Sequence, residues 1–155
     1  AVIKYLRYNT RSQIFAKSLP LLIVEGMLKR MEMVISMPEL REKLWHNVNR
    51  LQQGLKDRGF DIGNTNSPVT PIYMKGDVPE ATQMVMDLRE NYHIFCSIVV
   101  YPVIPKGDII YRLIPTAAHS DADIDETLAA FEAVKKKLDT GMYKAADIPD
   151  MAEKM

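Results

Sequence analysis

Two short apolar runs in the second half of the sequence constrain the fold most strongly. The runs "IFCSIVVY" (residues 94–101) and "IIYRLI" (residues 109–114) are rich in β-branched and aromatic side chains, which favour buried strands. The segment between them, "PVIPKGD", contains a Pro-Lys-Gly turn. The simplest pairing of two such strands is an antiparallel hairpin with a long loop.

The first part of the chain predicts two consecutive helices. Residues 20–37 are apolar on nearly every side, and such a helix must be buried in a core or at an interface. Ser36 and Glu39 then have the spacing of a capping box, and Pro38 falls in the first turn, where its missing N–H costs nothing. Gly59 supplies a left-handed stop. The second helix is amphipathic, with one apolar stripe formed by Leu40, Leu44, Val48, Leu51 and Leu55.

The rest of the chain predicts one more strand and two more helices. Residues 69–74 have the pattern of a strand, and the prolines within and before it confine it to an edge or to irregular pairing. Pro79 opens a helix, and Ser120 with Asp123 has capping-box spacing at the start of the last one. We expect residues 141–155 to form a frayed tail. The stripe of the last helix consists of Ile124, Leu128, Phe131, Val134 and Leu138.

These elements have the order β-α-β-β-α after the first two helices. The predicted fold class is α/β of the α+β type, with a short, mostly antiparallel sheet covered by helices and preceded by a long apolar helix. We expect residues 38–140 to form this small domain and residues 141–155 to form the tail. Residues 1–37 are expected to be the end of a preceding domain and its connecting helix.

Composition excludes several classes of partner. The chain has 155 residues, of which 47% are hydrophobic, and its 20 basic side chains balance 20 acidic ones. This suits one globular domain with a core. Because like charges do not cluster, we expect no nucleic-acid or membrane surface, and no apolar stretch approaches the roughly 20 residues of a membrane span. The single Cys96 predicts a buried thiol in a reducing compartment, the cytoplasm.

A complete catalytic set is missing from the sequence. It has no Gly-x-Gly-x-x-Gly, no Walker loop, no Cys-x-x-Cys and no His-Glu-x-x-His, so we expect no metal site. We expect His46 to be solvated and His93 to cap a helix. His119 is expected to tie the turn before Ser120 to the sheet.

Arg112 requires an explanation because it lies within the apolar run 109–114. An unpaired buried cation is costly. A carboxylate of the chain itself, or a position on the solvent face of the strand, would satisfy it without any function. The functional alternative is a ligand carboxylate held by two parallel N–H···O bonds, a geometry that arginine forms and lysine does not. Periodicity alone leaves these alternatives open.

The segment "PVIPKGDIIYRLIPTAAHSDADID" resembles the C-terminal part of the α-oxoamine synthases, which carry Pro-x-x-Pro-x-Gly, a strand with an arginine, and Thr/Ser-Ala-Ala-His before an acidic helix start. "LRYNTRSQIFAKSLP" and "SPVTPIYM" are similar to two further segments of that family, so the resemblance runs from about Leu6 to Leu138. The family includes glycine C-acetyltransferase, 8-amino-7-oxononanoate synthase and serine palmitoyltransferase. The resemblance implies the small C-terminal domain of the fold type I (aspartate aminotransferase) architecture. It also implies an enzyme that uses pyridoxal 5'-phosphate (PLP) to condense a small amino acid with an acyl-CoA.

The resemblance implies site residues as well. Arg112 matches the position that binds the carboxylate of the amino-acid substrate, which is a positioning role. Ala16 and Lys17 match a pair that reaches the cofactor phosphate of the other subunit, so a homodimer is implied. Ala16 lacks the hydroxyl found there in the family, so a contact would come from backbone N–H groups, from Lys17 or from Ser18. The Schiff-base lysine and the other catalytic residues lie upstream in the family, so this chain is expected to hold none and to be inactive alone.

Two non-catalytic interpretations stay open. The order β-α-β-β-α also suits a regulatory domain that binds an amino acid through Arg112, or a dimerisation domain. The sequence does not specify which amino acid or which acyl-CoA would react.

Overall fold

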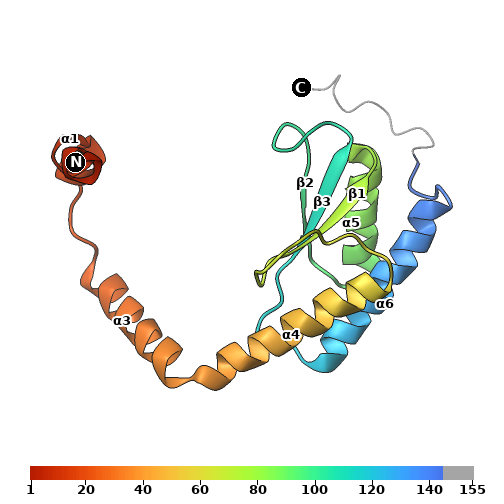
Figure 1. Ribbon diagram of the computed structural model, residues 1–155, viewed down its shortest axis with the longest axis horizontal. Helices are drawn as coiled ribbons and strands as arrows, with labels where there is room; N and C mark the ends of the chain where they lie inside the picture. The colour runs from red at the N-terminus through yellow and green to blue at the C-terminus, as the bar shows by residue number, and fades with distance from the viewer. Residues whose placement is uncertain (145–155) are drawn as a thin grey trace. The chain divides into compact units, whose positions relative to one another are not determined.

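The computed structural model describes residues 1–144, and the chain divides into two compact units at Pro38 and Glu39. The first unit holds α1 (Val2–Asn9), α2 (Arg11–Ile14) and α3 (Leu21–Ser36). The second unit holds α4, the sheet and the last two helices (Figure 1). What each unit represents in a longer protein stays a prediction.

The apolar helix α3 forms where the sequence predicts it, but the described residues do not bury it. Leu21 and Leu22 are 71% and 79% exposed, and no residue of α3 is buried. Burial in a core of the described residues is therefore wrong, and burial at an interface stays a prediction. A long apolar helix that stays exposed presents a surface suited to another protein surface.

The junction between α3 and α4 (Pro38–Asp57) differs from the expected capping box. Ser36 is the last residue of α3 rather than a cap, and its side chain makes no hydrogen bond to Glu39 among the described residues. Pro38 does occupy the first turn of α4. At the other end, Gly59 has a φ of 72°, as expected for a left-handed stop, and the Phe60 N–H donates to the Leu55 carbonyl at 3.0 Å.

The sheet contains β1 (Thr70–Lys75), β2 (Ser97–Val99) and β3 (Asp108–Leu113) in the order β1-β3-β2, with both pairings antiparallel. This confirms the hairpin of β2 and β3 and the edge position of β1. The second strand is shorter than the predicted 94–101 and only half-buried. Its ends leave the sheet because the Ile94 N–H donates to the Leu88 carbonyl, and a turn closes between Val100 and Val103.

Two complete capping boxes begin the remaining helices. In α5 (Val78–Tyr92) the Glu80 N–H donates to the Asp77 carboxylate at 2.8 Å. In α6 (Asp121–Asp139) the Asp123 N–H donates to the Ser120 hydroxyl at 3.2 Å, which confirms the predicted cap.

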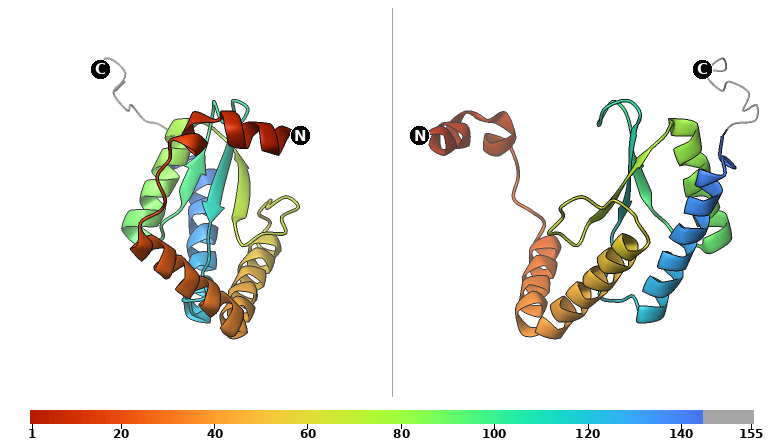
Figure 2. Two further views of the ribbon diagram at one scale, coloured as in Figure 1. Left: turned by 90° about the vertical axis from the view of Figure 1, so that its left-hand side faces the viewer. Right: turned by 45° about the vertical axis from the view of Figure 1, so that its right-hand side comes forward.

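One continuous core lies between the sheet and the helices α4, α5 and α6. Figure 2 shows α5 and α6 on one side of the sheet. The sheet and all three helices contribute side chains to this core. The rings of Phe60 and Phe131 pack edge to face, with their centroids 6.0 Å apart. The best-buried members include Leu51, Ile72, Met84, Leu88, Tyr111 and Phe131. The sheet thus has one covered face.

The opposite face of the sheet, the open face, carries the other set of strand side chains. Cross-strand register places on it Pro71, Tyr73, Lys75, Ser97, Val99, Asp108, Ile110 and Arg112, all of them half-buried or exposed. Because side chains alternate along a strand, residues that flank the buried Tyr111 must point this way.

The segment after α6 is partly anchored, contrary to the expectation of a frayed tail from residue 141. Gly141 ends the helix with a φ of 75°, and Tyr143 is buried, with its hydroxyl donating to Asp87. Residues 145–155, the rest of the expected tail, lie outside the described residues. In the described part of the chain, no helix is long and apolar enough to cross a membrane.

Candidate substrate site on the open face of the sheet

Arg112 lies in β3 and points to the open face of the sheet. Tyr111 and Leu113 on either side are buried, so strand alternation turns the Arg112 side chain outward. Its direct neighbours across the sheet are Pro71 in β1 and Ser97 in β2. The Arg112 Nε donates to the Ser97 Oγ at 3.1 Å.

The charge of Arg112 is not balanced within residues 1–144. No carboxylate oxygen of these residues lies within 4.0 Å of its guanidinium, which excludes a salt bridge inside the described part of the chain. The side chain is exposed, so the structure agrees with the solvent-face alternative, and it does not place the guanidinium against buried apolar surface. Both terminal nitrogens lack a partner among the same residues. They form a two-pronged donor, the geometry that suits a carboxylate.

The turn that follows β3 is fixed by a buried residue that sequence reasoning missed. Asn47 of α4 is fully buried, and its Nδ2 donates to the carbonyls of Thr116 and His119, both at 2.9 Å. His119 in turn accepts the Thr116 N–H at its Nδ1, at 3.0 Å. The His119 side chain therefore closes the turn within residues 116–119, and its predicted tie to the sheet stays a prediction. The bonds that attach the turn to another element come from Asn47 of α4. Only the apolar neighbourhood of Asn47, beside Val48 and Leu51, gave any signal.

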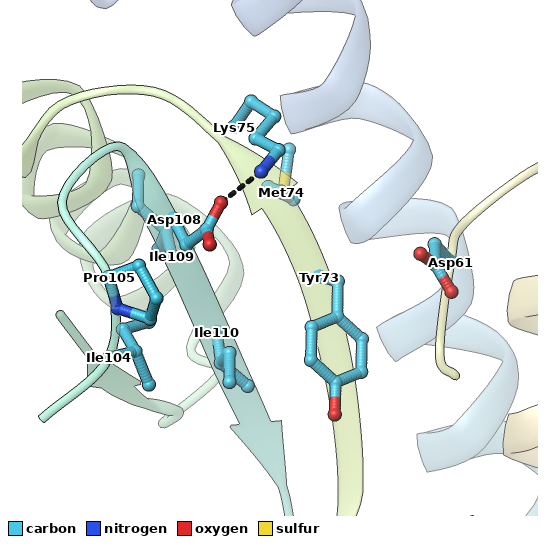
Figure 3. A pocket seen from close by; sticks show the side chains of 9 residues that line it. All are labelled: Asp61, Tyr73, Met74, Lys75, Ile104, Pro105, Asp108, Ile109 and Ile110. Carbon is cyan, nitrogen blue, oxygen red and sulfur yellow. Dashed lines mark hydrogen bonds and ion pairs between the residues drawn. The ribbon is translucent and has the colours of Figure 1, made fainter. Parts of the chain in front are cut away.

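A hollow of about 400 Å³ lies toward the other end of β3. Its lining includes Tyr73 of β1, Ile110 of β3 and the loop residues Ile104 and Pro105, and Figure 3 shows the two loop residues beside β3. Lys75 and Asp108 form an ion pair at its rim, so their charges cancel. Its polar lining side chains are Asp61, Tyr73, Lys75 and Asp108, and the rest of the lining is apolar.

Ala16 and Lys17 lie in the coil between α2 and α3, and both are exposed. The N–H groups of residues 16–19 have no backbone acceptor among the described residues. Together with the Lys17 ammonium, they are donors that fit a phosphate group, which is the chemistry the predicted cofactor contact requires. The assignment of Ala16 and Lys17 stays a prediction.

The other sequence candidates have structural roles. His93 has a φ of 57° and caps α5, as expected. His46 is not merely solvated, because its Nε2 lies 2.9 Å from a carboxylate oxygen of Asp121 on α6. Cys96 is buried, and burial raises the pKa of its thiol to about 11, which disfavours the nucleophilic thiolate. The described residues include no cluster of metal ligands.

Comparison with known proteins shows what the chain is similar to. It is 65% identical over 144 residues to a cysteate-C-fatty acyltransferase of Capnocytophaga ochracea, which covers 93% of this chain and 34% of that protein. It is 36% identical over 136 residues to a serine palmitoyltransferase of Sphingobacterium spiritivorum, covering 88% of this chain and 34% of that one. The chain thus spans about a third of the length of the curated relatives it matches.

The chain is also similar in fold to solved structures of serine palmitoyltransferases. A serine palmitoyltransferase from Sphingomonas wittichii has a TM-score of 0.78 and 26% identity, covering 89% of this chain and 35% of that one. A serine palmitoyltransferase structure that contains PLP matches with a TM-score of 0.78 and 27% identity, covering 88% of this chain and 34% of that one. These matches confirm the predicted fold type I architecture and the resemblance to the α-oxoamine synthases.

The family model for aminotransferase class I and II matches residues 1–131, which is most of the chain. The relatives and the PLP-containing neighbour agree with this match, and the predicted cofactor of the family is confirmed. The chain therefore belongs to the aminotransferase class I and II family of pyridoxal-phosphate enzymes.

Proposed function

We propose that the full-length protein is a PLP-dependent acyltransferase, which transfers the acyl group of an acyl-CoA to a small amino acid and releases CoA. In this proposal, the present chain supplies Arg112, which binds the carboxylate of the amino acid. The observation that carries the proposal is the state of Arg112. Its two terminal nitrogens have no partner among residues 1–144, while its Nε donates to Ser97. A bidentate carboxylate is the partner that this arrangement fits.

Within this proposal, the residues of the chain bind and orient. Arg112 holds the carboxylate and thereby sets the orientation of the bonds around the α-carbon, which is a gain in proximity and alignment rather than proton transfer. Lys17, Ser18 and the N–H groups of residues 16–19 bind the cofactor phosphate. PLP, when bound, acts as the electron sink for carbanion chemistry at that carbon. The lysine that carries the cofactor would come from outside this chain.

The amino-acid substrate that we propose is cysteate, with a fatty acyl-CoA as the donor. The support is the identity of 65% to a relative named for cysteate, against 36% to a relative named for serine. Cysteate and serine share the carboxylate that Arg112 would bind, so Arg112 is not expected to discriminate between them. Selection would come from residues that meet the sulfonate.

The assembly that we propose is a cytoplasmic homodimer. The exposed apolar side chains of α3 support a covering surface in the full protein, and the buried reduced thiol of Cys96 supports a reducing compartment. The chain of 155 residues alone is predicted to be inactive.

The experiment is an assay of CoA release by the full-length protein with palmitoyl-CoA and, in turn, cysteate, serine, glycine and alanine. We expect cysteate to react best. Arg112→Ala should weaken amino-acid binding by about 1.5–3 kcal/mol, the usual worth of hydrogen bonds to a charged group. Arg89→Ala, which removes an exposed arginine of α5, is the matched control and should leave the rate unchanged.

Three outcomes would count against this proposal. A protein without PLP absorbance and without CoA release would overturn it. Amino-acid binding without the cofactor would favour a regulatory domain. Unchanged substrate affinity in Arg112→Ala would remove Arg112 from the site and favour a purely structural role.

A further inference from the structure

The side chain that is hydrogen-bonded to Arg112 is Ser97, which no sequence pattern marked. The two residues are direct partners in the antiparallel pairing of β2 and β3, so their side chains leave the sheet on the same face. The Arg112 Nε donates to the Ser97 Oγ at 3.1 Å. This hydrogen bond is the only one of the Arg112 side chain within residues 1–144.

We propose that Ser97 is a positioning residue for substrate binding, which fixes the Arg112 guanidinium so that the edge formed by its two terminal nitrogens faces the amino-acid carboxylate. This inference rests on the proposed function. Ser97 itself is not expected to touch the substrate.

The first argument is the geometry of the guanidinium. It can bind a carboxylate in two ways, along the edge that contains Nε or along the edge of the two terminal nitrogens. Ser97 occupies the Nε donor, so the first edge is no longer free for a bidentate contact. The terminal edge is the one that remains, and a carboxylate is directed to it.

The second argument is conformational freedom. An exposed arginine side chain has many rotamers, and restricting it to one of them when a ligand binds costs conformational entropy. Ser97 reduces this cost before the substrate arrives, because its own backbone is held by the sheet and it follows the buried Cys96. An arginine that is already oriented binds its ligand more tightly.

The test compares Ser97→Thr with Ser97→Val in the full-length, PLP-loaded protein. Threonine keeps the hydroxyl and valine replaces it with a methyl group of the same shape, and both are good strand residues. The amino-acid dissociation constant is measured by titrating the cofactor absorbance with cysteate, without acyl-CoA. Thermal unfolding of each variant reports on the fold separately.

We expect Ser97→Thr to bind like the wild type and Ser97→Val to bind about three- to tenfold more weakly, the usual effect of losing one hydrogen bond. The unfolding temperatures should agree, and the turnover number at saturating amino acid should stay within about twofold. A second comparison is made in an Arg112→Lys background. Lysine has no Nε donor, so the difference between threonine and valine should vanish there.

The outcomes separate this inference from the function on which it rests. Equal affinity of the threonine and valine variants, with Arg112→Ala weakening binding, would overturn the role of Ser97 alone. A valine loss that persists in the Arg112→Lys background would show a structural effect and would also overturn it. A wild-type protein that binds neither cysteate, serine nor glycine would overturn both the inference and the proposed function.

Discussion

Lys137 on α6 and Asp87 on α5 form an ion pair with an N–O distance of 2.7 Å, and the Asp87 side chain is only 10% exposed. Asn91 and the buried Tyr143 donate hydrogen bonds to the same carboxylate. The cluster therefore joins two helices and the segment that follows α6. It is the main polar contact between α5 and α6 among the described residues.

Asp87→Asn is predicted to destabilise the second unit by about 2–3 kcal/mol at pH 7, because the hydrogen bonds lost involve charged groups. Urea unfolding of the chain measures this difference. Glu126→Gln is the matched control, since Glu126 is exposed on α6 and makes no ion pair with a described residue. The control should lie within about 0.5 kcal/mol of the wild type.

The same cluster predicts a pH dependence. Burial opposes ionisation of Asp87, but the hydrogen bonds from Lys137, Tyr143 and Asn91 outweigh it, so the pKa of this carboxyl lies below its ordinary value. A group with a lowered folded pKa stabilises the fold at a pH above its unfolded pKa of about 4, and the stabilisation disappears as the pH falls through the folded pKa. The difference between wild type and Asp87→Asn should thus be constant from pH 5 to 7 and shrink below about pH 4. A constant difference down to pH 2 would contradict this assignment.

Asn47→Ala tests the anchor of the turn after β3. The substitution removes the buried donor of two partly buried hydrogen bonds to the carbonyls of Thr116 and His119, so we predict a loss of about 1–3 kcal/mol in the free energy of unfolding. Asn49→Ala, two residues along the same helix and exposed, should change it by less than about 0.5 kcal/mol. Equal changes in the two variants would show that the helix propensity of alanine, rather than the loss of the Asn47 hydrogen bonds, determines the change in unfolding free energy.

Gly54 of α4 lies against Leu128 of α6. A Cβ atom there would fall well inside van der Waals contact with the methyl groups of Leu128. Gly54→Ala is therefore predicted to destabilise by about 1–3 kcal/mol, although alanine normally favours a helix. In α3, the Cβ of Gly26→Ala meets only the flexible end of Arg30 at 3.2 Å, so that variant should be neutral or stabilising. Thermal unfolding of both variants checks the opposite signs.

The parts of the fold that the sequence predicted correctly are those that depend on neighbouring residues. The cap at Ser120, the stop at Gly59 and the first-turn position of Pro38 each depend on contacts within a few residues. The predicted cap at Ser36 failed because α3 continues to that residue and only Met37 interrupts the helix. Two candidate ends of a helix within one short segment cannot be ranked from local pattern alone.

The site depends on contacts between distant residues, and these were not predictable. Arg112 was found because a charge in an apolar run is conspicuous, but its exposure follows from the burial of Tyr111 and Leu113 beneath the helices. Ser97 and Asn47 became visible only through the strand register and the packing of α4, which bring together residues 15 and 69 positions apart. The length of β2 was overestimated for the same reason. The strand is limited by the hydrogen bond from Ile94 to Leu88 of α5 on one side and by the turn from Val100 to Val103 on the other.

Cys96 provides a probe of the sheet that needs no cofactor or substrate. It is 4% exposed, and burial raises its pKa to about 11, so at pH 8 much less of this thiol is the reactive thiolate than in an exposed cysteine. We predict that iodoacetamide labels the native chain at least about a hundredfold more slowly than the urea-unfolded chain. The control is the double variant Cys96→Ala with Ser97→Cys, in which strand alternation moves the thiol to the open face and labelling should be fast. Rapid labelling of native Cys96 would show that β2 is not held in the sheet, and the positioning of Arg112 by Ser97 would lose its structural basis.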